Sequence, residues 1–189
     1  MKLQDELPQY VTVGKRRVRV DMDFRNILRM MDVLQDDNLT DEAREYKACQ
    51  CITKHPRPGL LAEVKKLAFG DATKTEHRNR VTSFEQDADL IRAAFQQAYG
   101  IDLYTEKVHW LRFMALLQGL PEDTQYMAVV GIRARPMPKP TKYNREEREW
   151  LRKAKNQYAI KTTEKEQEKT YQNNVADIFH GIMAMIPKG

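Results

Sequence analysis

The chain has 189 residues, of which 41% are hydrophobic and 31% are charged, and its mean hydropathy is −0.71. This length suits one domain, or one domain with an appendage, and the composition is typical of a modest core under a charged surface. No run approaches the ~20 apolar residues of a membrane span. The N-terminal residues also lack the basic stretch and apolar core of a secretory signal, so we expect a cytoplasmic protein without a membrane partner.

The charge balance is mildly basic, with 32 Lys and Arg against 27 Asp and Glu and an isoelectric point near 9.1. Nucleic-acid-binding proteins usually concentrate their basic residues in a patch. One such cluster occurs in a run that alternates polar and apolar residues: Lys15, Arg16, Arg17 and Arg19. We treat these four residues as a weak alternative site for nucleic acid, which we do not otherwise expect as a partner.

The N-terminal part predicts a β-hairpin followed by three helices. Residues 10–13 and 17–20 are rich in β-branched side chains and flank Gly14, as in a hairpin. Apolar residues then recur at helical spacing from Phe24 to Leu34, after Asp21 or Asp23 as a capping residue. A second helix starts after Thr40 or Asp41 and stops before the prolines of residues 55–59, and a third, from residue 60, ends at Gly70.

The remaining chain predicts more helices, separated by polar and proline-rich segments. After a polar linker at 71–82, Ser83 and Gln86 form a capping box that opens a helix ending at Gly100. Residues 106–118 predict a helix that is apolar nearly all round, and Pro121 opens the next one. Three prolines between 136 and 140 predict an extended connector before a charged helix at 145–158.

The predicted fold class is therefore mainly α: a small N-terminal β-hairpin, a compact multi-helix bundle and a C-terminal helical extension. We expect a helical body at residues 1–138, made of parts 1–70 and 83–138 joined by the linker. Residues 139–189 form the extension, which is a proline-linked charged helix followed by an amphipathic C-terminal helix.

A search for catalytic and metal-binding patterns finds no phosphate-cradling glycine loop, no zinc-type spacing of Cys and His, and no nominated nucleophile. Glu85 and Asp89 share a helical face and are compatible with a divalent cation, but acids in a first helical turn also stabilise the helix dipole, which is the reading we favour. Cys49 and Cys51 point to different faces of a helix, which disfavours a disulfide or shared metal. We expect no enzyme activity, cofactor or metal.

Two segments with aromatic residues are compatible with a functional role as well as with a structural one. His109-Trp110 lies on the most apolar predicted helix, so we interpret Trp110 as a core anchor and His109 as a residue that satisfies a neighbour. Trp150 and Tyr158 lie among basic residues, a pattern that also occurs in single-strand binding. Acidic residues are interleaved there, so a solvated helix that docks one aromatic edge is the preferred interpretation.

The C-terminal segment has the sharpest amphipathic pattern in the chain. Its apolar residues follow helical spacing: Val175, Ile178, Phe179, Ile182, Met183 and Ile186. A polar stretch at 161–174 precedes it and would let it extend away from the rest of the protein. This stripe is either docked on its own domain or offered to a partner, and the sequence leaves both open.

Residues 83–133 resemble the bacteriophage gene-product-fifteen family, found in siphophages and in prophages of Gram-positive hosts. The resemblance is carried by Ser83-Phe-Glu-Gln-Asp-Ala-Asp-Leu-Ile91, Ala94-Phe95, Tyr99-Gly-Ile-Asp-Leu103, His109-Trp110, Phe113, Leu116-Leu117, Gly119-Leu-Pro-Glu-Asp-Thr124 and Ile132-Arg133. Asp23-Phe-Arg25 is similar to the family's start, and the helix from Trp150 to Tyr158 fits its C-terminal part loosely.

The resemblance implies a role in phage tail morphogenesis and carries no catalytic residues. Family members look like products of the gene slot that typically holds tail assembly chaperones. We therefore expect a non-catalytic chaperone that binds the tape-measure protein and the tail-tube protein through the C-terminal stripe, with homo-oligomerisation open. It would act in the host bacterial cytoplasm and be absent from the mature virion. The alternative is a structural virion component, such as a head–tail connector or tail-completion subunit.

Overall fold

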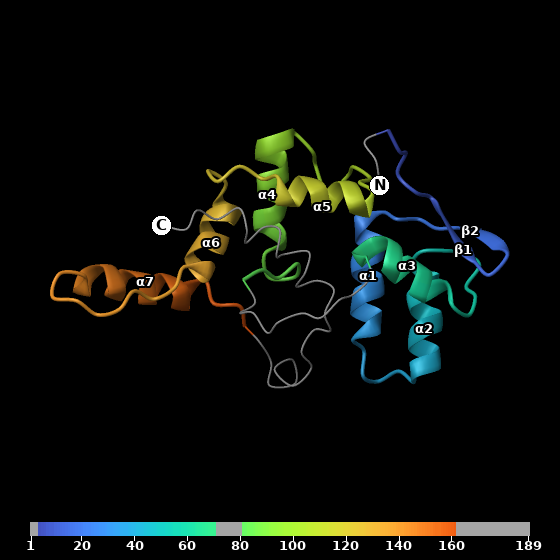
Figure 1. Cartoon of the computed structure of the whole chain (residues 1–189), viewed down its shortest axis with the longest axis horizontal. Coiled ribbons are helices and arrows are strands. Elements are labelled where there is room, and N and C mark those ends of the chain that lie inside the picture. The colour runs from blue at the N-terminus through green and yellow to red at the C-terminus, as the bar shows by residue number, and fades with distance from the viewer. Residues whose placement is uncertain (1–3, 71–80, 162–189) are drawn as a thin grey trace. The chain divides into compact units, whose positions relative to one another are not determined.

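A computed structural model describes residues 4–70 and 81–161 of the chain (Figure 1). Most of the predicted linker and all of the C-terminal stripe, 175–186, lie outside these residues. Within them, seven helices and one two-stranded antiparallel sheet make a mainly α protein, so the predicted fold class is confirmed. None of the described helices has the length and apolar character that crossing a membrane requires.

The N-terminal hairpin forms from strands β1 (Tyr10–Val13) and β2 (Arg16–Arg19). Val11 lies opposite Val18 and both are buried, so the alternating pattern fixes which face of the hairpin points inward. Val13 pairs with Arg16, which leaves Gly14 and Lys15 as a two-residue turn. Gly14 has a φ of +60°, a conformation that such turns need and that glycine adopts without strain. The second strand therefore starts one residue earlier than predicted.

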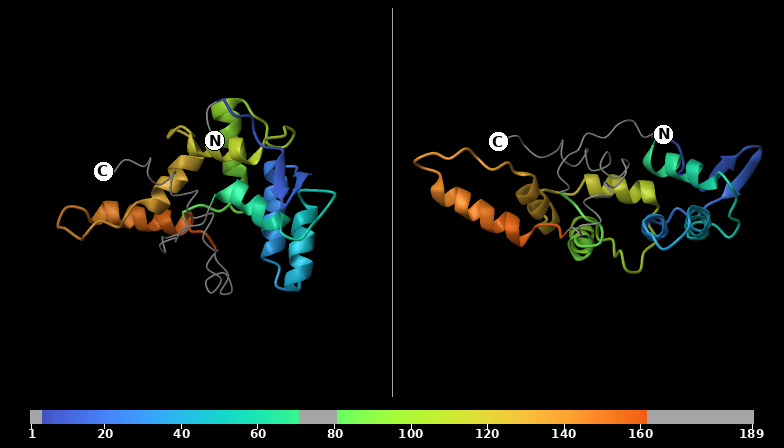
Figure 2. Two further views of the ribbon diagram at one scale, coloured as in Figure 1. Left: turned by 45° about the vertical axis from the view of Figure 1, so that its right-hand side comes forward. Right: turned by 90° about the horizontal axis from the view of Figure 1, so that it is seen from below.

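Three helices follow the hairpin: α1 (Phe24–Leu34), α2 (Asp41–Gln50) and α3 (Leu60–Phe69). The Asp23 carboxylate accepts from the Arg25 amide at 3.0 Å and the Thr40 hydroxyl accepts from the Ala43 amide at 3.3 Å, so both predicted caps are confirmed. Helices α1 and α2 lie side by side, as the end-on view in Figure 2 shows, and α3 packs against β1. Gly70 ends α3 as predicted.

The chain divides into two compact units, and each contains two separate stretches of sequence. The first unit is residues 1–72 with 106–115, and the second is residues 73–105 with 116–189. Helix α5 (Trp110–Gln118) begins in the first unit and runs into the second.

In the first unit, residues 108–110 pair with the backbone just before α1. The Phe24 amide donates to the Val108 carbonyl at 2.9 Å, and the Trp110 amide donates to the Met22 carbonyl at 2.6 Å. His109 forms an isolated β-bridge with Asp23, so α5 begins only at Trp110 and the predicted start at Glu106 was wrong. Trp110 is fully buried, and its indole donates to the Ala68 carbonyl at 2.9 Å. Its expected role as a core anchor is confirmed.

The second unit contains α4 (Ala88–Tyr99), α6 (Gln125–Ala134) and α7 (Arg145–Gln157), with α6 packed against both of the others. Gly100 ends α4 in the left-handed conformation, as predicted. The predicted start of α6 at Pro121 was wrong. The Thr124 hydroxyl caps the helix by accepting from the Met127 amide at 3.3 Å, so residues 121–123 form a turn before it.

Candidate functional site

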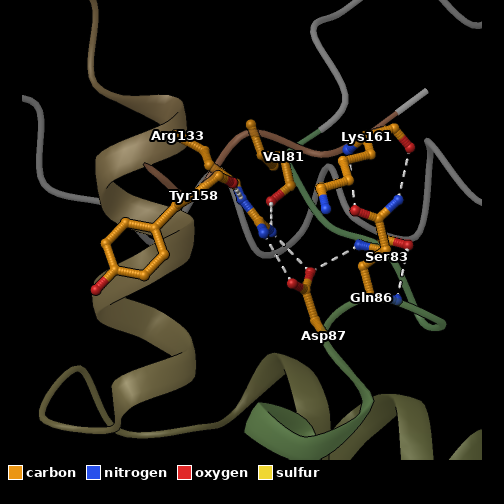
Figure 3. A network of polar contacts seen from close by, with 7 residues as sticks. All are labelled: Val81, Ser83, Gln86, Asp87, Arg133, Tyr158 and Lys161. Carbon is orange, nitrogen blue, oxygen red and sulfur yellow. Dashed lines mark hydrogen bonds and ion pairs between the residues drawn. The ribbon is translucent and has the colours of Figure 1, made fainter. Parts of the chain in front are cut away.

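A buried ion pair forms the centre of the second unit. Arg133, near the end of α6, donates to both carboxylate oxygens of Asp87 at 2.7 and 2.8 Å (Figure 3). The Asp87 side chain is 1% exposed and that of Arg133 is 9% exposed. A two-point pairing of a guanidinium with a carboxylate combines charge with fixed geometry, which is how a buried pair compensates for lost hydration.

The same two side chains bind backbone groups from two further parts of the chain. Asp87 accepts from the Ser83 amide at 2.8 Å, and Arg133 donates to the Val81 carbonyl at 3.1 Å and to the Tyr158 carbonyl at 2.6 Å (Figure 3). We call this network, with Gln86 and Lys161, the Arg133 clasp. It joins the segment before α4, the end of α6 and the segment after α7.

The predicted capping box is half right. The Ser83 hydroxyl accepts from the Gln86 amide at 3.2 Å, as expected. The Ser83 amide, however, donates to Asp87 and not to Gln86. Residues 84–87 form a turn, and α4 begins at Ala88. The carboxylate of Asp87 is held by Arg133 and Ser83, so Asp87 makes no side-chain cap of α4.

Gln86 instead holds the last described residue of the chain. Its side-chain amide donates to the Lys161 carbonyl at 2.7 Å, and its side-chain oxygen accepts from the Lys161 amide at 2.9 Å (Figure 3). With the Arg133 bond to Tyr158, this fixes the backbone at both ends of the short segment 158–161. The polar sequence that leads to the C-terminal stripe starts at this anchored point.

Tyr126 on α6 lies close enough to the ion pair to sense its charges. Burial raises the pKa of the Tyr126 hydroxyl far above its ordinary value, the charge of Asp87 raises this pKa further, and the charge of Arg133 lowers it. The hydroxyl is buried without a hydrogen-bond partner among residues 4–70 and 81–161. The buried ion pair and the neutral Tyr126 hydroxyl thus lie in the same interior region. This arrangement can fix backbone segments in place.

Sequence reasoning missed this site because it treated its members separately. The sequence pattern indicates that Glu85 and Asp89 are acids at a helix start, and Asp87 lies between them. In the structure they separate, since Asp89 pairs with Arg92 at 2.8 Å and Asp87 turns inward. The available signal was that Asp87 and Arg133 both stand among the residues that carry the family resemblance. Over the described part of the chain, no group of three or more His, Cys, Asp or Glu side chains is placed to hold a metal.

The other residues singled out from the sequence lie apart from the clasp. His109 accepts from the Leu111 amide at 3.2 Å through Nδ1, so its Nε2 carries the proton and donates to the Pro8 carbonyl at 3.0 Å. This confirms its structural role. Trp150 is 54% exposed, Tyr158 is half-buried, and the buried residues of α7 are Leu151 and Ala154. Lys15, Arg16, Arg17 and Arg19 are all exposed on the hairpin.

Cys49 is buried and Cys51 half-buried, and both are free thiols, as the helical spacing predicted. Burial raises the pKa of both, which favours the protonated form.

Comparison with known proteins gives one match. The family model described as bacteriophage Gp15 protein matches residues 3–160, which include every residue of the Arg133 clasp except Lys161. No curated protein and no solved structure matches the chain. The matched region spans most of the sequence and both compact units, and it confirms the resemblance drawn from residues 83–133. The chain therefore belongs to the bacteriophage Gp15 protein family.

Proposed function

We propose that this phage protein is a tail assembly chaperone that binds the tape-measure protein through its C-terminal stripe. Family membership supports the coarser statement, a structural or morphogenetic role in a phage. The finer proposal rests on the sequence beyond residue 161, where six apolar residues recur at helical spacing after a polar stretch. We propose further that the protein is non-catalytic, acts in the host cytoplasm and does not remain in the virion.

The observation that carries the proposal is the anchoring of residues 158–161 by the Arg133 clasp. A chaperone that presents a segment to a client needs a stable body and a fixed point from which the segment leaves it. Arg133 and Gln86 hold the backbone at Tyr158 and Lys161 with three hydrogen bonds. Thirteen residues separate Lys161 from Val175, the first residue of the stripe. An amphipathic helix at the end of such a tether suits a hydrophobic groove or a long helical client.

The direct test is co-expression of the full chain with the tape-measure protein of the same phage. The test variant carries Asp in place of Ile178, Phe179 and Ile182. The wild-type chain should keep the client soluble and co-purify with it, and the variant should lose the complex, because three carboxylates cannot enter an apolar interface without a large desolvation cost.

A matched control places three aspartates in the same segment but off the stripe, at Asn173, His180 and Ala184. By helical spacing these positions lie opposite the apolar residues. The control should bind the client as the wild type does. Equal loss in both variants would mean that charge in the tail, and not the stripe, governs binding.

The alternative function, a structural virion component, predicts a different outcome. Purified virions would then contain the protein in a fixed ratio to the tail-tube protein, whether or not the tape measure binds it in isolation. That result would refute the chaperone proposal while leaving the family assignment intact.

A further inference from the structure

In the structure a second basic segment lies beside the hairpin. The sequence pattern did not indicate that these two segments are neighbours. This segment is the loop between α2 and α3, residues 51–59. The Thr53 hydroxyl donates to the Arg19 carbonyl at 3.0 Å, and the Asp21 amide donates to the Ile52 carbonyl at 2.7 Å. At the loop's other end, a Cβ built on Gly59 would lie 3.7 Å from Val13. The loop therefore borders the hairpin at both ends (Figures 1 and 2).

Hairpin and loop together form a surface on the first unit that carries cationic side chains and no acidic ones. We call it the hairpin basic surface: Lys15, Arg16, Arg17, Arg19, Lys54 and Arg57. Residues 14–19 and 53–59 contain no Asp or Glu. The nearest acids in sequence are Asp21, which follows the hairpin, Glu63 in the first turn of α3, and Asp5 and Glu6 on the segment that enters the hairpin.

No described acidic side chain pairs with these cations. Within residues 4–70 and 81–161, none of the six forms an ion pair, whereas arginines elsewhere on the chain, such as Arg44 and Arg92, do. Arg17 is held in place by a different contact, since its guanidinium lies over the ring of Tyr10 at 4.2 Å from the centroid. Five of the six are exposed and Arg57 is half-buried.

The composition of this surface indicates the class of partner. Protein–protein interfaces are centred on buried aromatic and aliphatic side chains, with charges depleted at the core. Among the large exposed hydrophobic residues of the described chain, Tyr10 alone belongs to the hairpin, and it already stacks on Arg17. Interfaces with nucleic acid are instead polar and strongly positive, and most of their hydrogen bonds go to phosphate and sugar.

We propose that the hairpin basic surface binds the phosphodiester backbone of double-stranded DNA without sequence preference. Six unpaired cations on two adjacent segments would replace the counterions that DNA condenses, which is the main source of sequence-independent affinity. The inference goes beyond the chaperone proposal, since it assigns a separate surface and a separate partner.

The test uses full-length protein and a fluorescently labelled DNA duplex of mixed sequence, with affinity measured by anisotropy over a range of salt concentrations. A hairpin variant replaces Lys15, Arg17 and Arg19 with Ser. These side chains are exposed, so circular dichroism should show an unchanged fold. The variant should bind on the order of tenfold or more weakly at low salt, and the slope of log K against log salt should become shallower by about three.

A loop variant, with Ser at Lys54 and Arg57, tests the same surface outside the strands. It should weaken binding with a slope change of about two. The matched control replaces three exposed cations elsewhere in the first unit, Lys47, Lys107 and Arg112, with Ser. The control removes as much charge as the hairpin variant and should bind within about threefold of the wild type.

Three outcomes would overturn the proposal. The wild-type protein could fail to bind DNA even at low salt. The control could lose as much affinity as the hairpin variant, which would assign binding to net charge alone. Finally, the hairpin variant could keep its DNA affinity while losing self-association in sedimentation, which would assign the surface to a second copy of the chain.

Discussion

Asp87 and Arg133 are 46 positions apart in the sequence, and they meet through two hydrogen bonds of 2.7 and 2.8 Å in the interior of the second unit. Each also holds backbone from elsewhere, Asp87 at Ser83 and Arg133 at Val81 and Tyr158. The pair therefore does more than cancel two charges. It fixes the path of the chain before α4 and after α7.

Removing one member of this pair should be costly. Arg133→Met leaves the Asp87 carboxylate buried without its partner, and the free energy of unfolding should fall by about 3–5 kcal/mol. Urea denaturation of the full chain, followed by circular dichroism, measures this change. Adding Asp87→Leu to that variant should recover part of the loss, because no uncompensated charge then stays buried. A single variant within about 1 kcal/mol of the wild type would show that the pair is solvated or dispensable.

Two tyrosines, Tyr126 buried and Tyr99 half-buried, provide a comparison of an unpartnered hydroxyl group with a hydrogen-bonded one. Tyr126→Phe should leave stability unchanged or raise it by about 1 kcal/mol, because its hydroxyl has no partner among the described residues. Tyr99→Phe should lower stability by about 1 kcal/mol, because the Tyr99 hydroxyl donates to the Leu116 carbonyl at 2.8 Å. Thermal and urea unfolding give both values. A destabilised Tyr126→Phe variant would imply that this hydroxyl has a partner after all.

Tyr126 should also make stability depend on pH in the alkaline range. Burial raises its pKa above the ordinary value of 10.0, so folding favours the protonated form. Below pH 10 its contribution is fully present. Above pH 10 the unfolded state loses this proton first, and the free energy of unfolding falls by up to about 1.4 kcal/mol per pH unit from this group alone.

The check is to measure urea unfolding of the wild type and of Tyr126→Phe between pH 8 and pH 12. The difference between the two proteins should be constant up to about pH 10 and should then widen in favour of the variant. Cys49, whose pKa burial also raises from 9.0, adds its own fall to both proteins and cancels in the comparison. A constant difference across the range would contradict the raised pKa of Tyr126.

The two tryptophans should behave as opposite fluorescence probes. Trp110 is fully buried against Phe113 and Phe69, whereas Trp150 is 54% exposed on α7. The Trp150→Phe variant should emit at shorter wavelength than the wild type and should resist quenching by iodide. Trp110→Phe, if folded by circular dichroism, should show the reverse. Equal quenching of the two residues would mean that Trp110 is open to solvent.

Much of the fold follows from local sequence signals. Asp23 and Thr40 each precede a helix and cap it, and Gly70 and Gly100 each end one. These features depend on neighbours within about one helical turn, so reading the sequence in order is enough to find them. The hairpin register likewise follows from Val11 and Val18 and from a glycine in the turn.

The features that were missed depend on contacts distant in sequence. Residues 106–109 run directly into an apolar helical stretch and were predicted as its first turn, yet residue 108 pairs with Phe24 and the helix begins only at Trp110. The sequence around Asp87 indicates only an acid at a helix start, and its pairing with Arg133 is seen only in the structure. The basic loop residues Lys54 and Arg57 gain their significance only from lying next to the hairpin. In each case contacts between residues distant in sequence override the local preference, and a short window of sequence does not contain both partners.

The interleaving of the two units sets an order for synthesis. A nascent chain that has emerged as far as α3 carries the hairpin and three helices of the first unit, but it lacks Trp110 and Phe113. These two rings stack with each other in the core of that unit, and Phe113 also stacks against Phe24. Those residues leave the ribosome only after the whole of α4 has been made. Neither unit can therefore be completed during translation before the other has begun, and a gene cut within residues 73–105 would yield two fragments, neither of which contains a complete unit.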